Sequence, residues 1–157
     1  MAKILIVYYS RTGTTKKVAE ALQTKFNCDI ESVESVKNRS GAWGYIFSGK
    51  EATQRSLTEI KPAKQDPSGY DLVIVGTPIW SWNVSSIIRT YLDQQKGKIK
   101  KAAFFCTMGG SGHERAFSDM EKTIEVKPIT TMSLLTKQVV TNNFQTELDQ
   151  FAQELSK

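Results

Sequence analysis

Hydrophobic residues along this chain fall into short continuous runs separated by longer segments of mixed polarity. Three runs, at 4–9, 72–75 and 102–106, are almost wholly apolar and rich in β-branched or aromatic residues. Continuous apolarity over so few residues predicts strands covered on both faces, as at the centre of a parallel sheet. Two weaker and more polar runs, at 28–33 and 129–134, predict edge strands.

The segments between these runs carry apolar residues at helical spacing, which predicts helices with one buried face. A further helix is predicted near 50–57, inside a less regular segment at 35–68. For the last helix, Thr141 or Asn142 is available as the N-cap residue. The apolar residues at helical spacing form four sets, one for each predicted helix: Val18, Leu22 and Phe26; Val84, Ile87, Ile88, Tyr91 and Leu92; Ala116, Phe117, Met120 and Ile124; and Phe144, Leu148, Phe151, Ala152 and Leu155.

Strands that alternate with helices predict an α/β fold, because parallel strands need crossover connections. We expect a doubly wound, five-stranded parallel sheet with helices on both faces, in a single domain over residues 1–157. In such sheets, ligands bind beyond the carboxyl ends of the strands, where the strand order reverses. The loops that follow the three strongest strands are therefore the candidates for chemistry.

Composition narrows the class of protein. The chain has 157 residues, a net charge of +5, two cysteines and one histidine. Cys28 and Cys106 give no disulfide framework or metal-ligand spacing, and His113 alone cannot complete a common zinc site, so we expect no metal. No apolar stretch has membrane-spanning length and no signal-peptide pattern is present, so we expect a cytoplasmic protein without membrane contact. The basic residues are scattered and no nucleic-acid motif accompanies them, so we expect no nucleic-acid partner.

The first loop, which joins the first strand to the first helix, has the composition of a phosphate-binding loop. It supplies four hydroxyls, one guanidinium and one glycine, and it contains no acidic residue. It also opens a helix, whose free N–H groups and positive dipole end attract anions. This donor set exceeds what an ordinary capped turn needs. The loop consists of Ser10, Arg11, Thr12, Gly13, Thr14 and Thr15.

The second and third loops suit a planar ring. Residues 76–83 include Trp80 and Trp82, which can offer a flat apolar surface to an aromatic ligand, although one of them could instead cover the core. Residues 107–112 contain three glycines, which let backbone groups approach a ring edge, although a flexible turn has the same composition. The three loops together indicate a phosphorylated planar heterocycle as ligand.

At residues 9–15 the chain resembles the Ser-x-Thr-Gly-x-Thr phosphate loop of flavodoxins and flavodoxin-like flavoproteins, and the similarity continues at 70–80 and 105–110. The resemblance implies a sheet of strand order 2-1-3-4-5 that binds FMN non-covalently, with the phosphate on residues 10–15. It implies no catalytic side chain, because the flavin carries the redox chemistry. The remaining contacts to FMN would come from Thr77, Pro78, Ile79, Trp80, Trp82, Asn83, Thr107, Met108, Gly109, Gly110 and Ser111.

The resemblance implies an electron carrier between redox proteins, but two departures leave a second function open. Typical flavodoxins are acidic, whereas this chain is basic. Flavodoxins often stabilise the one-electron-reduced flavin by a backbone flip at a glycine, yet residues 77–95 contain none, and Asn83 is the residue there that best tolerates positive φ. The alternative is an FMN-dependent NAD(P)H:quinone-type oxidoreductase that transfers hydride through flavin N5. The partner is accordingly a redox protein or NAD(P)H with a quinone, and the sequence assigns no oligomeric state.

One basic cluster stands out from the scattered charges. Lys96, Lys98, Lys100 and Lys101 form either a solvated turn or a docking site for an acidic partner.

Overall fold

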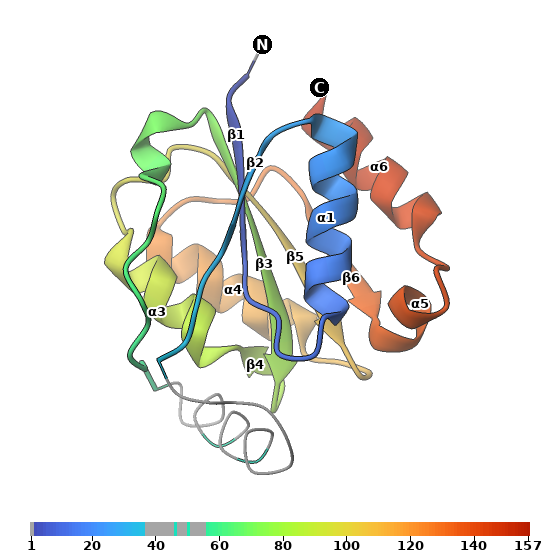
Figure 1. Ribbon diagram of the computed structural model, residues 1–157, viewed down its shortest axis with the longest axis horizontal. Coiled ribbons are helices and arrows are strands. Elements are labelled where there is room, and N and C mark those ends of the chain that lie inside the picture. Colours follow the sequence, from blue (N-terminus) through green and yellow to red (C-terminus); the bar gives the residue numbers. More distant parts are fainter. Residues whose placement is uncertain (1, 37–45, 47–49, 51–55) are drawn as a thin grey trace.

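The computed structural model describes residues 2–36, 46, 50 and 56–157, in which strands alternate with helices (Figure 1). The helix predicted near 50–57 falls largely outside these residues. The strands are β1 (Ile4–Tyr8), β2 (Asp29–Ser32), β3 (Leu72–Trp80), β4 (Asn83–Val84), β5 (Ala102–Met108) and β6 (Thr131–Leu135). The helices are α1 (Thr14–Phe26), α3 (Ser86–Gln94), α4 (His113–Ile124), α5 (Thr136–Val140) and α6 (Gln145–Leu155), with a 3-10 turn at Pro67–Gly69.

The five longer strands form one parallel sheet in the order β2-β1-β3-β5-β6. Counted in chain order without the short β4, this is the expected order 2-1-3-4-5, and the predicted fold class is confirmed. The two weak polar runs are the edge strands β2 and β6, also as predicted. The strand order reverses between β1 and β3, so the carboxyl ends of these two strands mark the switch point of the sheet.

Each face of the sheet has its own core, because successive side chains of a strand point to opposite faces. Leu5 and Val7 join the core beneath α3 and α4, whereas Ile6 and Tyr8 join the core beneath α1, α5 and α6 (Figure 1). Helices on both faces explain why the central strands are continuously apolar. Within the described part of the chain, no helix combines the length and the apolarity needed to cross a bilayer.

Several element boundaries differ from the sequence prediction. β3 continues to Trp80 and turns back as β4, so Val84 lies in a strand rather than in α3, which begins at Ser86 with Ser85 as its N-cap. Neither Thr141 nor Asn142 caps α6, whose N-cap position is occupied by Phe144. The reason is the unpredicted short helix α5, because the Thr141 hydroxyl bonds back to its Lys137 carbonyl.

The outer edge of β2 is covered by the segment at 59–65. Ser35 forms an antiparallel bridge with Ile60, just beyond the end of the strand. Nearer the middle, the buried carboxylate of Glu31 accepts hydrogen bonds from the backbone N–H groups of Lys64 and Gln65, both at 2.8 Å. Two charge-assisted bonds thus satisfy a carboxylate that burial alone would disfavour.

Candidate functional site

The first loop lies directly beyond the carboxyl end of β1 and is shaped by two of its own residues. The Ser10 hydroxyl accepts a hydrogen bond from the Gly13 N–H at 3.0 Å. Gly13 is the N-cap of α1 at φ 97°, a conformation that side chains other than glycine rarely adopt. No acidic residue occupies the first turn of α1. The free N–H groups and the positive end of this helix therefore face the loop without a competing negative charge.

A pocket of about 230 Å³ joins this loop to the ends of β3 and β5. The structure therefore brings together segments from all three predicted loops, at the switch point of the sheet. Eleven of the seventeen predicted cofactor-binding residues line the pocket: Ser10, Arg11, Thr12, Thr14, Thr15, Pro78, Ile79, Trp80, Thr107, Met108 and Gly109. Six others do not line it: Gly13, Thr77, Trp82, Asn83, Gly110 and Ser111.

A buried pair of hydroxyls joins two sides of the pocket. Thr15 Oγ1 and Thr107 Oγ1 lie 2.8 Å apart, although the two residues are 92 positions apart in the sequence. Thr15 is 1% exposed and Thr107 is 3% exposed, so water does not compete for this bond. The pair fixes the first turn of α1 against the end of β5, and with it the distance between the first and third loops.

The predicted second loop is a β-hairpin rather than an irregular loop. Trp80 pairs with Asn83 across a two-residue turn formed by Ser81 (φ 49°) and Trp82 (φ 61°). Positive φ at both central residues is the requirement of a type I′ hairpin turn. Asn83, the residue of this segment that best tolerates positive φ, does not adopt it, because the hairpin register puts the turn one residue earlier.

The two tryptophans of this hairpin have different environments. Trp80 is 7% exposed, lines the pocket and packs edge-on against Tyr9, with ring centroids 5.6 Å apart. Trp82 is 63% exposed, and its indole N–H donates to the Ser111 hydroxyl at 3.1 Å. The buried Trp80 thus forms a wall of the pocket, while Trp82 lies on its rim.

The hairpin tip and the third loop approach each other so closely that only glycine fits at the contact. A Cβ on Gly112 would lie 2.6 Å from the Trp82 Cα, and Gly112 adopts φ 110° as the N-cap of α4. Together with the bond from Trp82 to Ser111, this contact joins the second and third loops at the rim of the pocket.

Thr77 and Asn83 hold the hairpin in place. The buried Thr77 hydroxyl lies 3.1 Å from the Ser85 hydroxyl, and Ser85 caps α3 by accepting from the Ile88 N–H. The Asn83 side-chain amide donates to the Ser81 carbonyl at 3.0 Å, which supports the turn. Both side chains are almost fully buried. The Asn83 Oδ1, by contrast with its amide nitrogen, has no hydrogen-bond partner among the described residues.

Thr136 is a pocket residue that the sequence prediction missed. It begins α5, lines the pocket, and donates its hydroxyl to the Met108 carbonyl at 3.2 Å. The rule that ligands bind beyond the carboxyl ends of the strands could have found it, because Thr136 directly follows β6. The prediction covered only the loops after the three strongest strands, and β6 is a weak edge strand.

Two other sequence candidates lie away from the pocket. The lysine cluster at 96–101 precedes β5 and therefore lies at the amino ends of the strands, at the opposite edge of the sheet. Within it, Lys96 Nζ lies 3.5 Å from Glu125 Oε1. Cys106 is fully buried in β5, and burial raises the pKa of its thiol to about 12. A thiol that stays protonated near neutral pH is a core residue rather than a nucleophile.

Comparisons with known proteins agree with this architecture. A family model described as Flavodoxin matches residues 3–151. A flavoprotein from Lactobacillus acidophilus, solved in complex with FMN, is 26% identical at a TM-score of 0.74, covering 90% of this chain and 98% of that one. A candidate flavoprotein from Bacteroides eggerthii is 25% identical at a TM-score of 0.71, covering 97% of this chain and 99% of that one. Because the family model spans nearly the whole sequence, this chain belongs to the flavodoxin family.

Proposed function

We propose that this chain binds FMN in the pocket between α1, β3 and β5 and carries electrons between redox partners. The observation that carries the proposal is the set of donors at residues 10–15. Arg11 and the hydroxyl-bearing Ser10, Thr12 and Thr14 line the pocket beside the N-terminus of α1, with no acidic side chain in the first turn of the helix. Such donors suit a phosphate monoester. The similar protein from Lactobacillus acidophilus was crystallised with FMN, which supports the same ligand here.

In this proposal each side of the pocket has a separate task. Residues 10–15 hold the phosphate, and the buried Trp80 and the backbone of Met108 and Gly109 form the walls toward the flavin ring. The bound flavin supplies the redox chemistry, while the protein supplies binding, orientation and electrostatics. The bond between Thr15 and Thr107 keeps the phosphate side and the ring side at a fixed separation.

The size of the pocket favours a carrier. Its volume of about 230 Å³ lies below the roughly 300–1,000 Å³ typical of pockets that enclose a small molecule. A pocket of this size would leave part of a bound nucleotide exposed to solvent. An exposed ring edge is what electron transfer to another protein requires.

The hairpin tip favours a second candidate, an FMN-dependent NAD(P)H:quinone-type oxidoreductase. Both left-handed positions of the turn, Ser81 and Trp82, are occupied by residues other than glycine. A backbone rearrangement beside the flavin is therefore costly, which weakens one-electron chemistry relative to hydride transfer. The net charge of +5 also suits an anionic dinucleotide.

FMN titration of the apoprotein tests the binding site. Thr12→Ala and Thr14→Ala each remove a hydroxyl beside the proposed phosphate, and loss of a bond to a charged group costs about 1.5–3 kcal/mol, or roughly 10- to 150-fold in affinity. Thr24→Ala, which removes an exposed hydroxyl from the same helix, is the matched control. Riboflavin lacks the phosphate, so its affinity should not change. Unchanged FMN affinity in both pocket variants would refute the assigned phosphate site.

Anaerobic mixing of the FMN-loaded protein with NADH or NADPH separates the two functions. Rapid bleaching of the flavin absorbance would show hydride transfer and favour the oxidoreductase. Absence of bleaching, together with reduction by dithionite and reoxidation by an added redox protein, would favour the carrier.

A further inference from the structure

The two edge strands of the sheet, β2 and β6, differ in charge and in whether another segment covers their outer edge. The outer edge of β2 carries Asp29 and Glu31 and is covered by the segment at 59–65. Strand β6 contains no charged residue between Thr131 and Leu135. Among the described residues, its only strand partner is β5. An uncharged, uncovered edge strand is a ready template for another strand, and natural proteins usually protect such an edge.

The register shows which backbone groups of β6 are available. The Phe104 N–H donates to the Thr130 carbonyl, and Phe104 pairs with Thr131. In a parallel ladder, alternate residues direct their backbone groups to the same neighbouring strand. Residues 130, 132 and 134 therefore bond to β5, and Thr131, Ser133 and Leu135 direct their backbone groups away from it. The Leu135 N–H already donates to the Gln138 side chain at 2.9 Å, so the outward groups of Thr131 and Ser133 are the ones that a further strand can bond.

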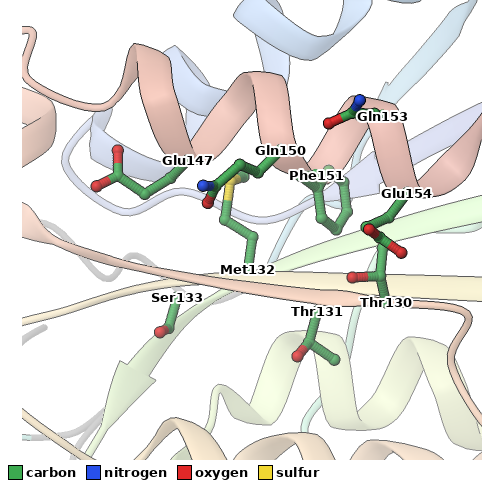
Figure 2. Close-up of a pocket in the computed structure, with 9 residues that line it drawn as sticks. All are labelled: Thr130, Thr131, Met132, Ser133, Glu147, Gln150, Phe151, Gln153 and Glu154. Atoms are coloured by element: carbon green, nitrogen blue, oxygen red, sulfur yellow. The ribbon is translucent and has the colours of Figure 1, made fainter.

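A groove of about 510 Å³ runs along this open edge, between β6 and α6. Figure 2 shows Glu147, Gln150 and Glu154 of α6 on one side of the groove, with Thr131 and Ser133 of β6 on the other. None of the nine described residues that line it is basic, although the whole chain has a net charge of +5. The groove is thus an acidic strip on a basic protein.

We propose that this groove binds an extended basic segment of a partner protein, which adds to β6 as a further strand. Main-chain bonds to Thr131 and Ser133 would supply affinity, and alternate side chains of the segment would face α6, as in other cases of strand addition. Glu147 and Glu154 lie seven positions apart on α6, about 10 Å along the helix. Basic residues four positions apart on a strand, about 13 Å, reach both carboxylates with their flexible side chains.

Both carboxylates can exchange their present partners for such a segment. Glu154 Oε1 lies 2.6 Å from Lys157 Nζ, in a pair whose side chains are 48% and 67% exposed. Glu147 Oε1 accepts from the Gln138 side-chain amide at 3.2 Å, which leaves its negative charge uncompensated by that bond. The exposed pair between Glu154 and Lys157 contributes little, so replacing it with an incoming lysine costs little.

Charge argues against a second copy of this chain as the occupant. The β6 strand of a second copy contains no charged residue between Thr131 and Leu135. As the added strand, it would bring no lysine or arginine of its own to face Glu147 and Glu154.

Binding of a defined peptide to the full chain tests the proposal. The probe is a fluorescently labelled peptide with the sequence Thr-Lys-Thr-Val-Thr-Lys-Thr, capped at both ends. We expect saturable binding that weakens at least fivefold when both lysines are replaced by glutamate, and that is abolished by N-methylation of alternate backbone amides. In an amide NMR spectrum, the shifts should concentrate at Thr131 and Ser133.

Two variants locate the binding. Ser133→Pro removes one outward N–H, which an edge strand tolerates, and should weaken binding about tenfold, whereas Ser133→Thr keeps the N–H and should change it less than twofold. If Ser133→Pro fails to fold, Gln150→Trp, at an exposed helix position, fills the groove and should give the same loss. Equal binding by these variants, absence of binding, or a dimer in sedimentation that Ser133→Pro dissociates would each overturn the proposal.

Discussion

Replacing Thr107 with valine keeps the shape of the side chain but removes the hydroxyl that faces Thr15 at 2.8 Å. Both residues are almost fully buried, so the Thr15 hydroxyl would lose this partner without gaining water. A buried polar group left unsatisfied costs about 1–3 kcal/mol. Thr15→Val should cost a similar amount for the same reason. With a urea m-value of about 2 kcal/mol/M, each single variant should lower the unfolding midpoint by roughly 0.5–1.5 M.

The double variant decides whether the bond itself is responsible. Replacing both hydroxyls with methyl groups leaves no unsatisfied partner and should be nearly neutral, so the two single costs should not add. Urea unfolding of the apoprotein, followed by far-UV circular dichroism, measures all four proteins under one condition. A double variant whose cost equals the sum of the two single costs would refute the reasoning, as would single variants with the wild-type midpoint.

Three other variants test separate features of the structure. Glu31→Gln leaves one backbone N–H without an acceptor and should lower the free energy of unfolding by about 1.5–3 kcal/mol, whereas Glu34→Gln, at an exposed pair with Lys61, should leave the urea midpoint unchanged. Gly112→Ala should push the hairpin tip away and break the bond between Trp82 and Ser111, which tryptophan emission would report; an emission spectrum identical to that of the wild type would contradict this. Burial raises the pKa of Cys106 to about 12 and that of Cys28 to about 11, so both thiols stay protonated at pH 8. In a Cys28→Ser variant, Ellman's reagent should therefore react only after unfolding, and rapid reaction of the folded protein would show that Cys106 is accessible.

The sheet could be predicted from the sequence because short, continuous apolar runs between amphipathic segments are typical of buried parallel strands. The end of β3 was missed because Gly76 and Pro78 are usually signals of a loop. Pro78 is tolerated inside the strand because β1 stops pairing at Gly76, so no ladder bond is lost at the missing N–H. Helix α5 was missed because five residues are too few for a helical period to be visible.

At the candidate site, the sequence predicted which loops meet. It did not predict which of their side chains are buried, which line the pocket and which bond to one another. Trp80 and Trp82 look equivalent in the sequence, and only the hairpin register decides that one is buried and the other lies on the rim. The buried bond between Thr15 and Thr107 spans 92 positions, which no local pattern can indicate. Thr136 depended on the position of an edge strand relative to the pocket, which follows from topology rather than from composition.

The pocket is assembled from chain segments that begin near Ser10 and end at Thr136, and this has a consequence for biosynthesis. During translation, β1 cannot pair with β3 until the chain is some 68 residues longer, so the central pair of strands forms late. The last wall of the pocket appears only after β6 has left the ribosome. A ligand therefore finds its complete binding site only on a chain that has reached Thr136, because shorter chains lack at least one wall of the pocket. Such a ligand binds the folded protein and not the unfolded chain, so by mass action it raises the free energy of unfolding.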